Sequence, residues 1–150
     1  MRAPAISTIG TIVIAFLFTC LAGVCPAGAQ DARPAPLTET TWRLVELSGE
    51  PVAAADGARS PYLLLQAEGG RFQGFGGCNS FSGSYALEEG GRIRFTDVAA
   101  TMMACPDMET ESQLFKVLET TDNSALTDRG LSLNRARMAP LARFEAAPAP

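Results

Sequence analysis

Four cysteines are the most reactive side chains in this 150-residue sequence, and two of them lie where we expect a folded domain. Cys20 and Cys25 fall in an apolar N-terminal segment, whereas Cys78 and Cys105 lie far apart in the body of the chain. A thioredoxin-type redox pair needs Cys-x-x-Cys spacing. A zinc site normally needs four ligands, and the chain has no histidine. An even pair of cysteines in a chain expected to reach an oxidising compartment favours a disulfide. We therefore predict a structural disulfide between Cys78 and Cys105, with two free buried thiols as the main alternative.

Serine and glycine cluster around the first of these cysteines, in the segment 76–85, GGCNSFSGSY. A serine nucleophile would need a Gly-x-Ser-x-Gly or Ser-x-x-Lys motif or a histidine base, and none is present. A phosphate-binding loop would need a lysine after the glycines, and the only lysine is Lys116. We interpret the alternating serines as the solvated face of a strand and the glycines as turn residues. Asn79 is expected to hydrogen-bond the backbone of its own turn rather than a substrate.

Carboxylates and methionines gather around the second cysteine. Asp107, Glu109 and Glu111 lie near the predicted start of a helix, where they complement the helix dipole. A calcium site of the EF-hand type would need a ligand loop that the sequence lacks. Met102 and Met103 are expected to fill the core under the helix, with an adaptable apolar contact surface as the alternative. No metal or cofactor is expected.

The order of predicted elements is several strands, one helix, and then more strands. Alternating apolar residues and turn signals predict strands and hairpins, and Gly74 is expected to mark a β-bulge because Phe72 and Phe75 have opposite parity. An apolar stripe with helical spacing follows Pro106 and ends near Asp122. This order favours an α+β fold, a small antiparallel curled sheet or partial β-barrel with one packed α-helix and one disulfide. The predicted strands cover 42–47, 62–67, 71–76, 85–87, 93–95, 125–127, 131–133 and 141–144.

The N-terminus has the pattern of a secretory signal peptide. Arg2 is followed by an uncharged stretch from Thr8 to Val24, and Ala27-Gly28-Ala29 forms a cleavage site before Gln30. An uncleaved anchor and a lipid-anchored form are the alternatives. We expect a periplasmic or secreted protein with no stable membrane insertion after cleavage. The expected domains are a signal peptide over 1–29, a linker over 30–37, a folded domain over 38–145 and a disordered tail over 146–150.

The charge balance excludes some partners. Twelve basic and 16 acidic residues give a net charge of −4. Nucleic-acid binding depends on clustered lysine and arginine, so no nucleic-acid partner is expected.

Two motifs together resemble the META domain, also called the HslJ-like family of bacterial envelope proteins. They are GGCNSFSGSY at 76–85 and TMMACPDME at 101–109. The early Thr41-Trp42 pair, Glu111 and Phe115 after the second cysteine, and the closing strands agree with the resemblance. It implies a small barrel-like sheet with one helix and an exported protein linked to stress or antibiotic tolerance, and it carries over no catalytic residue. The segment 134–140 departs from the tight turn of the family, which leaves the last hairpin open.

These observations lead to the hypothesis of a non-enzymatic envelope protein that binds or stabilises other envelope components. A small hydrophobic ligand held between sheet and helix is the alternative partner. A carboxylate-dependent hydrolase and a secreted enzyme inhibitor are the alternative functions. The candidate binding surface consists of Asn79, Ser80, Phe81, Ser82, Tyr85, Met102 and Met103.

Overall fold

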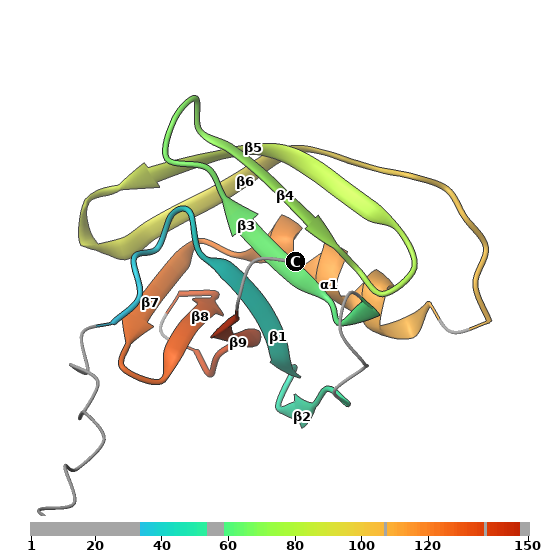
Figure 1. The fold of residues 1–150 in the computed structure, drawn as a ribbon. Helices are drawn as coiled ribbons and strands as arrows, with labels where there is room; N and C mark the ends of the chain where they lie inside the picture. The colour runs from blue at the N-terminus through green and yellow to red at the C-terminus, as the bar shows by residue number, and fades with distance from the viewer. Residues whose placement is uncertain (1–33, 54–58, 107, 137, 148–150) are drawn as a thin grey trace, which may run out of the picture. The chain divides into compact units, whose positions relative to one another are not determined.

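In the computed structural model, the described residues are 34–53, 59–106, 108–136 and 138–147 (Figure 1). The expected signal peptide over 1–29 lies outside the described residues, as do 30–33 of the expected linker and 148–150 of the expected tail.

Antiparallel strands form one sheet in the order β6-β5-β4-β3-β1-β9-β8-β7 (Figure 1). Neighbouring strands are mostly consecutive in the chain, because short turns join them as hairpins. β1 is the exception and pairs with both β3 and β9, which brings the N-terminal and C-terminal strands together. The strands are β1 (Thr41–Leu47), β3 (Tyr62–Leu65), β4 (Arg71–Phe75), β5 (Ser80–Glu88), β6 (Arg92–Ala100), β7 (Asn123–Thr127), β8 (Gly130–Asn134) and β9 (Ala142–Ala147), with the short β2 (Glu50–Pro51) paired to β1.

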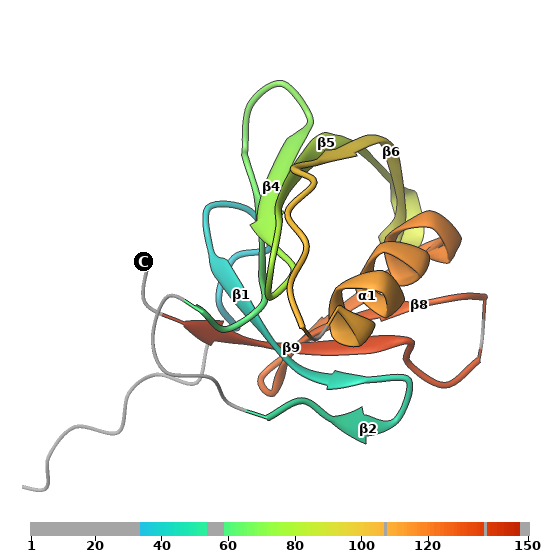
Figure 2. The ribbon, with the colours of Figure 1, turned by 90° about the vertical axis from the view of Figure 1, so that its right-hand side faces the viewer.

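The sheet curls until its two outer strands approach each other. The amide of Ile93 on β6 donates to the carbonyl of Asp122, just before β7, over 3.3 Å. The hydroxyl of Ser124 donates to the carbonyl of Gly91 over 3.1 Å. The helix α1 (Glu109–Thr120) lies against β6 and β1 on the open side of the curl (Figure 2). The predicted α+β class, with a curled antiparallel half-barrel and one packed helix, is therefore confirmed.

The core lies between the curled sheet and α1. Leu114, Val117 and Leu118 are buried on the inner face of the helix, as their spacing predicts. Met108, just before the helix, is the N-cap residue and is 36% exposed, and the cap has no side-chain hydrogen bond. The largest fully buried side chains are Trp42, Phe72, Phe144, Leu63, Leu65, Ile93, Leu114, Leu118, Leu131, Leu133 and Asn79.

β1 contains a bulge that the sequence pattern did not reveal. Strict alternation would place Leu47 on the face opposite Trp42 and Leu44. The register between β1 and β9 shifts between Leu44 and Glu46. Because one extra residue reverses the parity of a strand, Leu47 returns to the core with Trp42 and Leu44.

Gly74 does not form a bulge, so that expectation was wrong. β4 pairs in continuous register with β3 and β5, and Gly74 lies opposite Phe81 while Phe72 lies opposite Gly83. A Cβ atom at Gly74 would meet the carbonyl oxygen of Tyr62 and the ring of Phe81. A Cβ at Gly83 would come within 2.6 Å of the ring of Phe72. Each glycine therefore leaves room for the aromatic ring on the neighbouring strand.

The folded domain extends beyond both of the ends expected from the sequence. β9 continues to Ala147, which pairs with Thr41, so residues 146 and 147 of the expected tail belong to the sheet. Leu37 of the expected linker packs against the core, and its carbonyl accepts a 2.9 Å hydrogen bond from the indole of Trp42. The last hairpin forms despite its unusual turn, with Leu133 paired to Ala142.

Candidate functional site

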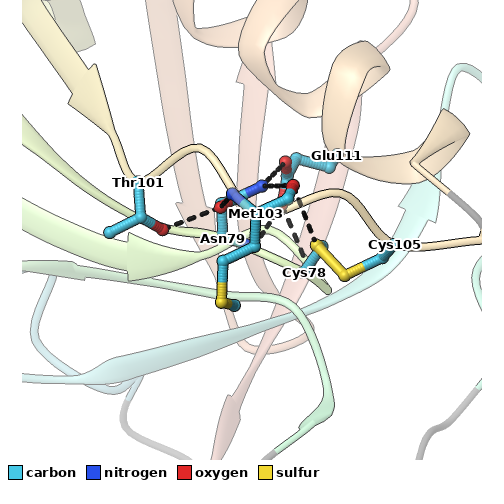
Figure 3. The surroundings of a disulfide bond; sticks show 6 residues. All are labelled: Cys78, Asn79, Thr101, Met103, Cys105 and Glu111. Atoms are coloured by element: carbon cyan, nitrogen blue, oxygen red, sulfur yellow. Dashed lines mark hydrogen bonds between the residues drawn. A yellow bond between two sulfur atoms is a disulfide. The ribbon is translucent and has the colours of Figure 1, made fainter.

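Asn79 is the centre of a polar network inside the fold (Figure 3). Its side-chain amide nitrogen donates to the carbonyl of Met103 over 3.1 Å and to Oε1 of Glu111 over 2.8 Å. Its Oδ1 accepts from the amide of Met103 over 2.7 Å and from the hydroxyl of Thr101 over 2.8 Å. These four bonds use the two donors and two lone pairs of a carboxamide. The side chain is thus fully paired at 2% exposure.

Glu111 holds the backbone on either side of Asn79. Its Oε2 accepts from the amide of Asn79 over 2.6 Å and from the amide of Cys78 over 3.2 Å. The side chain reaches this position because residue 111 lies in the first turn of α1 on the buried face, where it is 3% exposed. Hydrogen bonds to a carboxylate are stronger than those between neutral groups. Glu111 therefore joins the start of α1 to the loop between β4 and β5.

Glycine makes this close approach possible. A Cβ atom at Gly76 would lie 2.6 Å from Cγ of Glu111, so a larger residue would displace the carboxylate. Gly77 adopts a φ of 114°, which side chains disfavour. The amide of Gly76 also donates to the carbonyl of Asn79 over 2.9 Å, which closes the turn. The GGCN segment is therefore shaped to present its amides to Glu111.

A disulfide between Cys78 and Cys105 closes the same region covalently (Figure 3). Its two Cα atoms are 6.1 Å apart, and it joins the loop before β5 to the connection between β6 and α1. The predicted pairing is confirmed. Because disulfides persist in oxidising compartments, this bond indicates a location outside the cytoplasm.

Met102 and Met103 lie on the surface, so the expectation of core filling was wrong. Met102 is 99% exposed and Met103 is 56% exposed. Thr101 and Met103 are both tied to Asn79, and the amide of Thr101 donates to the carbonyl of Ser80 over 3.0 Å. Their backbone is held in place while the side chains face solvent. The alternative of an apolar contact surface fits these positions.

A shallow depression borders this connection on the outer side of β4, β5 and β6. Its volume is about 440 Å³, and no charged residue lines it. Ser80 and Ser82 of the candidate surface contribute to it, and Phe81 also lines it although it is 3% exposed and belongs to the core. The other lining residues are Tyr62, Gln73, Gly74, Ala99, Ala100 and Thr101.

The remaining candidate residues face inward. Tyr85 is part of the core, and its hydroxyl donates to the carbonyl of Gln66 over 2.6 Å. Burial, with a smaller contribution from the charge of Glu39, raises the pKa of Tyr85 above its usual 10.0. Asn79 is also buried, and its expected bond to its own turn is replaced by bonds to Met103, Thr101 and Glu111.

The charge pattern of the sequence did not predict that Glu111 accepts hydrogen bonds from Cys78 and Asn79. Sequence reasoning assigned it to the helix dipole, although the family resemblance had already singled out its position. Among the described residues, no group of three or more cysteine, aspartate or glutamate side chains is arranged to hold a metal ion. In the same part of the chain, none of the helices has the length and hydropathy of a membrane span.

The fold and this site define a class: curled antiparallel half-barrels in which a disulfide and a buried glutamate fix a glycine-rich loop against one helix. The chain belongs to the META domain family, whose model matches residues 35–148. A protein from Burkholderia xenovorans solved by NMR has a similar fold, with 24% identity and a TM-score of 0.60 over 82% of this chain and 99% of that one. A second NMR structure gives 22% identity and a TM-score of 0.56 over 72% of this chain and 91% of that one. A comparison with curated proteins gives no match.

Proposed function

We propose that this META-domain protein is an exported, non-enzymatic component of the cell envelope that binds another envelope protein. The binding region is the methionine surface, defined here as the side chains of Met102 and Met103 on the connection after β6. Residence in the periplasm or secretion, and a contribution to stress or antibiotic tolerance, are parts of the same proposal.

The observation that carries the proposal is the exposure of two neighbouring apolar side chains on an anchored backbone. Flexible, polarizable methionine side chains suit adaptable apolar protein contacts. Most flexible connections would lose conformational entropy on binding, which weakens association. Here the backbone of Met103 is already paired at both its amide and its carbonyl. The segment should therefore lose little conformational entropy when it binds a partner.

The polar groups of the site support binding rather than catalysis. Asn79 and Glu111 are committed to hydrogen bonds within the protein. The depression beside the methionine surface has hydroxyl and amide groups but no charged lining residue. A carboxylate-dependent hydrolase would need acidic side chains converging in a cleft, and Glu111 instead serves as a backbone acceptor.

Site-specific photo-crosslinking in the native envelope tests the proposal. A photoreactive residue at Ala104 leaves both methionines intact, and the same residue at Ala125, exposed on the edge strand β7, is the control. We expect one protein partner to crosslink from position 104 and not from 125. That crosslink should disappear in a Met102→Gln/Met103→Gln variant and persist in Met138→Gln. Equal crosslinking from both positions, or a crosslink that survives the double substitution, would contradict the proposal.

A further inference from the structure

The methionines of the described chain differ strongly in solvent exposure. Met102 is 99% exposed, Met138 68%, Met103 56% and Met108 36%. Oxidation of a thioether by a dissolved oxidant follows the access of the oxidant to sulfur. Met102 is thus the most exposed of the four methionines. The disulfide between Cys78 and Cys105, which ends the same connection, indicates an oxidising environment.

We infer that Met102 is a site of reversible oxidation to methionine sulfoxide, and that this modification weakens binding at the methionine surface without unfolding the protein. The modification follows from exposure, whereas its effect on binding rests on the function proposed above. The oxidant is a peroxide, which transfers one oxygen atom to the sulfur. The S–O bond forms as the O–O bond breaks, sulfur is oxidised by two electrons, and the peroxide leaves as water. A dithiol reductant of the methionine sulfoxide reductase class reverses the step, giving thioether, water and a disulfide.

The surrounding contacts explain why the fold should tolerate the extra oxygen. Met102 lies between two residues that are anchored to Asn79, Thr101 through its hydroxyl and Met103 through its amide and carbonyl. At 99% exposure its side chain makes almost no packing contact that a sulfoxide could disturb. In a buried methionine the polar oxygen would disrupt the core. At Met102 it instead changes the character of the contact surface from apolar to polar.

Peptide mass spectrometry during limited treatment of the folded protein with hydrogen peroxide tests the site. We expect Met102 to oxidise first, at a rate at least about twofold higher than that of Met108. The oxidation rate of Met138 in the same spectra is the internal comparison. Protein carrying the single Met102 sulfoxide should unfold at the same urea concentration as untreated protein. Faster oxidation of Met138 or Met108, or a clear drop in the unfolding midpoint, would overturn the inference.

Crosslinking from Ala104 tests the consequence for binding. Peroxide should remove the partner crosslink from the unsubstituted protein and leave it in Met102→Leu, which is apolar and has no sulfur at this position. Met102→Gln, a polar mimic of the sulfoxide, should lack the crosslink without peroxide. If the Met102 sulfoxide crosslinks as well as the untreated protein, the inference fails. If untreated protein gives no specific crosslink, the proposed function fails, while the oxidation order is judged from the mass spectra alone.

Discussion

The side chain of Asn79 hydrogen-bonds to the backbone of Met103 in the way that a neighbouring β-strand would. Its carboxamide accepts from the amide of Met103 over 2.7 Å and donates to the carbonyl of the same residue over 3.1 Å. These two residues are 24 positions apart. A single buried side chain thereby takes the place of a sheet neighbour just beyond the end of β6, and it fixes the backbone that carries the methionine surface.

Replacing Asn79 with alanine should lower stability and loosen this connection. The buried groups of Met103 and Glu111 would lose their partner, and we expect a loss of about 2–4 kcal/mol in the free energy of unfolding. Urea unfolding followed by the fluorescence of Trp42, the only tryptophan, measures the loss. Hydrogen exchange at the amide of Met103 should accelerate. Asn123→Ala on the edge strand β7 should change stability by less than about 0.5 kcal/mol, and equal effects at both positions would contradict the role of Asn79.

Glu111→Gln should destabilise the protein although its shape is nearly unchanged. Both carboxylate oxygens accept from N–H groups, whereas a glutamine would turn its own N–H₂ toward one set of these donors. We expect a loss of about 1–3 kcal/mol. Glu119→Gln, exposed in the last turn of α1, is the matched control and should be close to neutral. Unfolding midpoints that do not separate the two variants would refute the acceptor role.

Removing the disulfide should reduce stability while leaving the fold in place. The bond closes a loop of 27 residues, which corresponds to roughly 3–4 kcal/mol on the chain-entropy model. The measurement is urea unfolding of a Cys78→Ala/Cys105→Ala variant. Because Asn79 holds Met103 independently of the sulfurs, the Met103 amide should stay more protected in this variant than in Asn79→Ala. The reverse order of protection would show that the disulfide, not Asn79, holds the connection.

Gly74→Ala should disturb the sheet although alanine is a small residue. The new methyl group would meet the carbonyl oxygen of Tyr62 and the ring of Phe81, so one of these must move. Overpacking of this kind costs about 1–3 kcal/mol, which thermal or urea unfolding can measure. Ser82→Ala, on the opposite face of the adjoining strand β5, provides the comparison. If Gly74→Ala leaves the free energy of unfolding unchanged, then β3 and β5 can move apart without loss of stability, which would contradict the prediction.

Stability should fall at alkaline pH because of Tyr85. Burial, and to a lesser extent Glu39, raises the pKa of Tyr85 in the folded protein above 10.0, so folding favours the neutral phenol. The corresponding stability is fully present below the pKa of the unfolded chain and is lost as the pH rises through the folded pKa. Unfolding free energies measured from about pH 8 to pH 11 should decline more steeply than in Tyr85→Phe. Parallel pH profiles would count against this assignment.

Local patterns predicted the elements well because strands, hairpins and helices depend on neighbouring residues. Alternation over Leu131-Ser132-Leu133 and helical spacing from Leu114 to Leu118 both correspond to elements of the structure. The pairing of Cys78 with Cys105 followed from cysteine number and compartment. The expectation for Met102 and Met103 failed because apolar character does not say whether a residue lies over the core or beyond the end of a strand.

The order of elements, the disulfide and membership of the META domain family were determined by the sequence alone, since they depend on composition, short-range spacing and motif. Only the tertiary structure decided that Glu111 binds the amides of Cys78 and Asn79, and that Met102 faces solvent. Hydrogen bonds between residues more than 30 positions apart depend on where the curled sheet places the loop relative to α1. No local pattern contains that placement, because it arises from the packing of the whole domain.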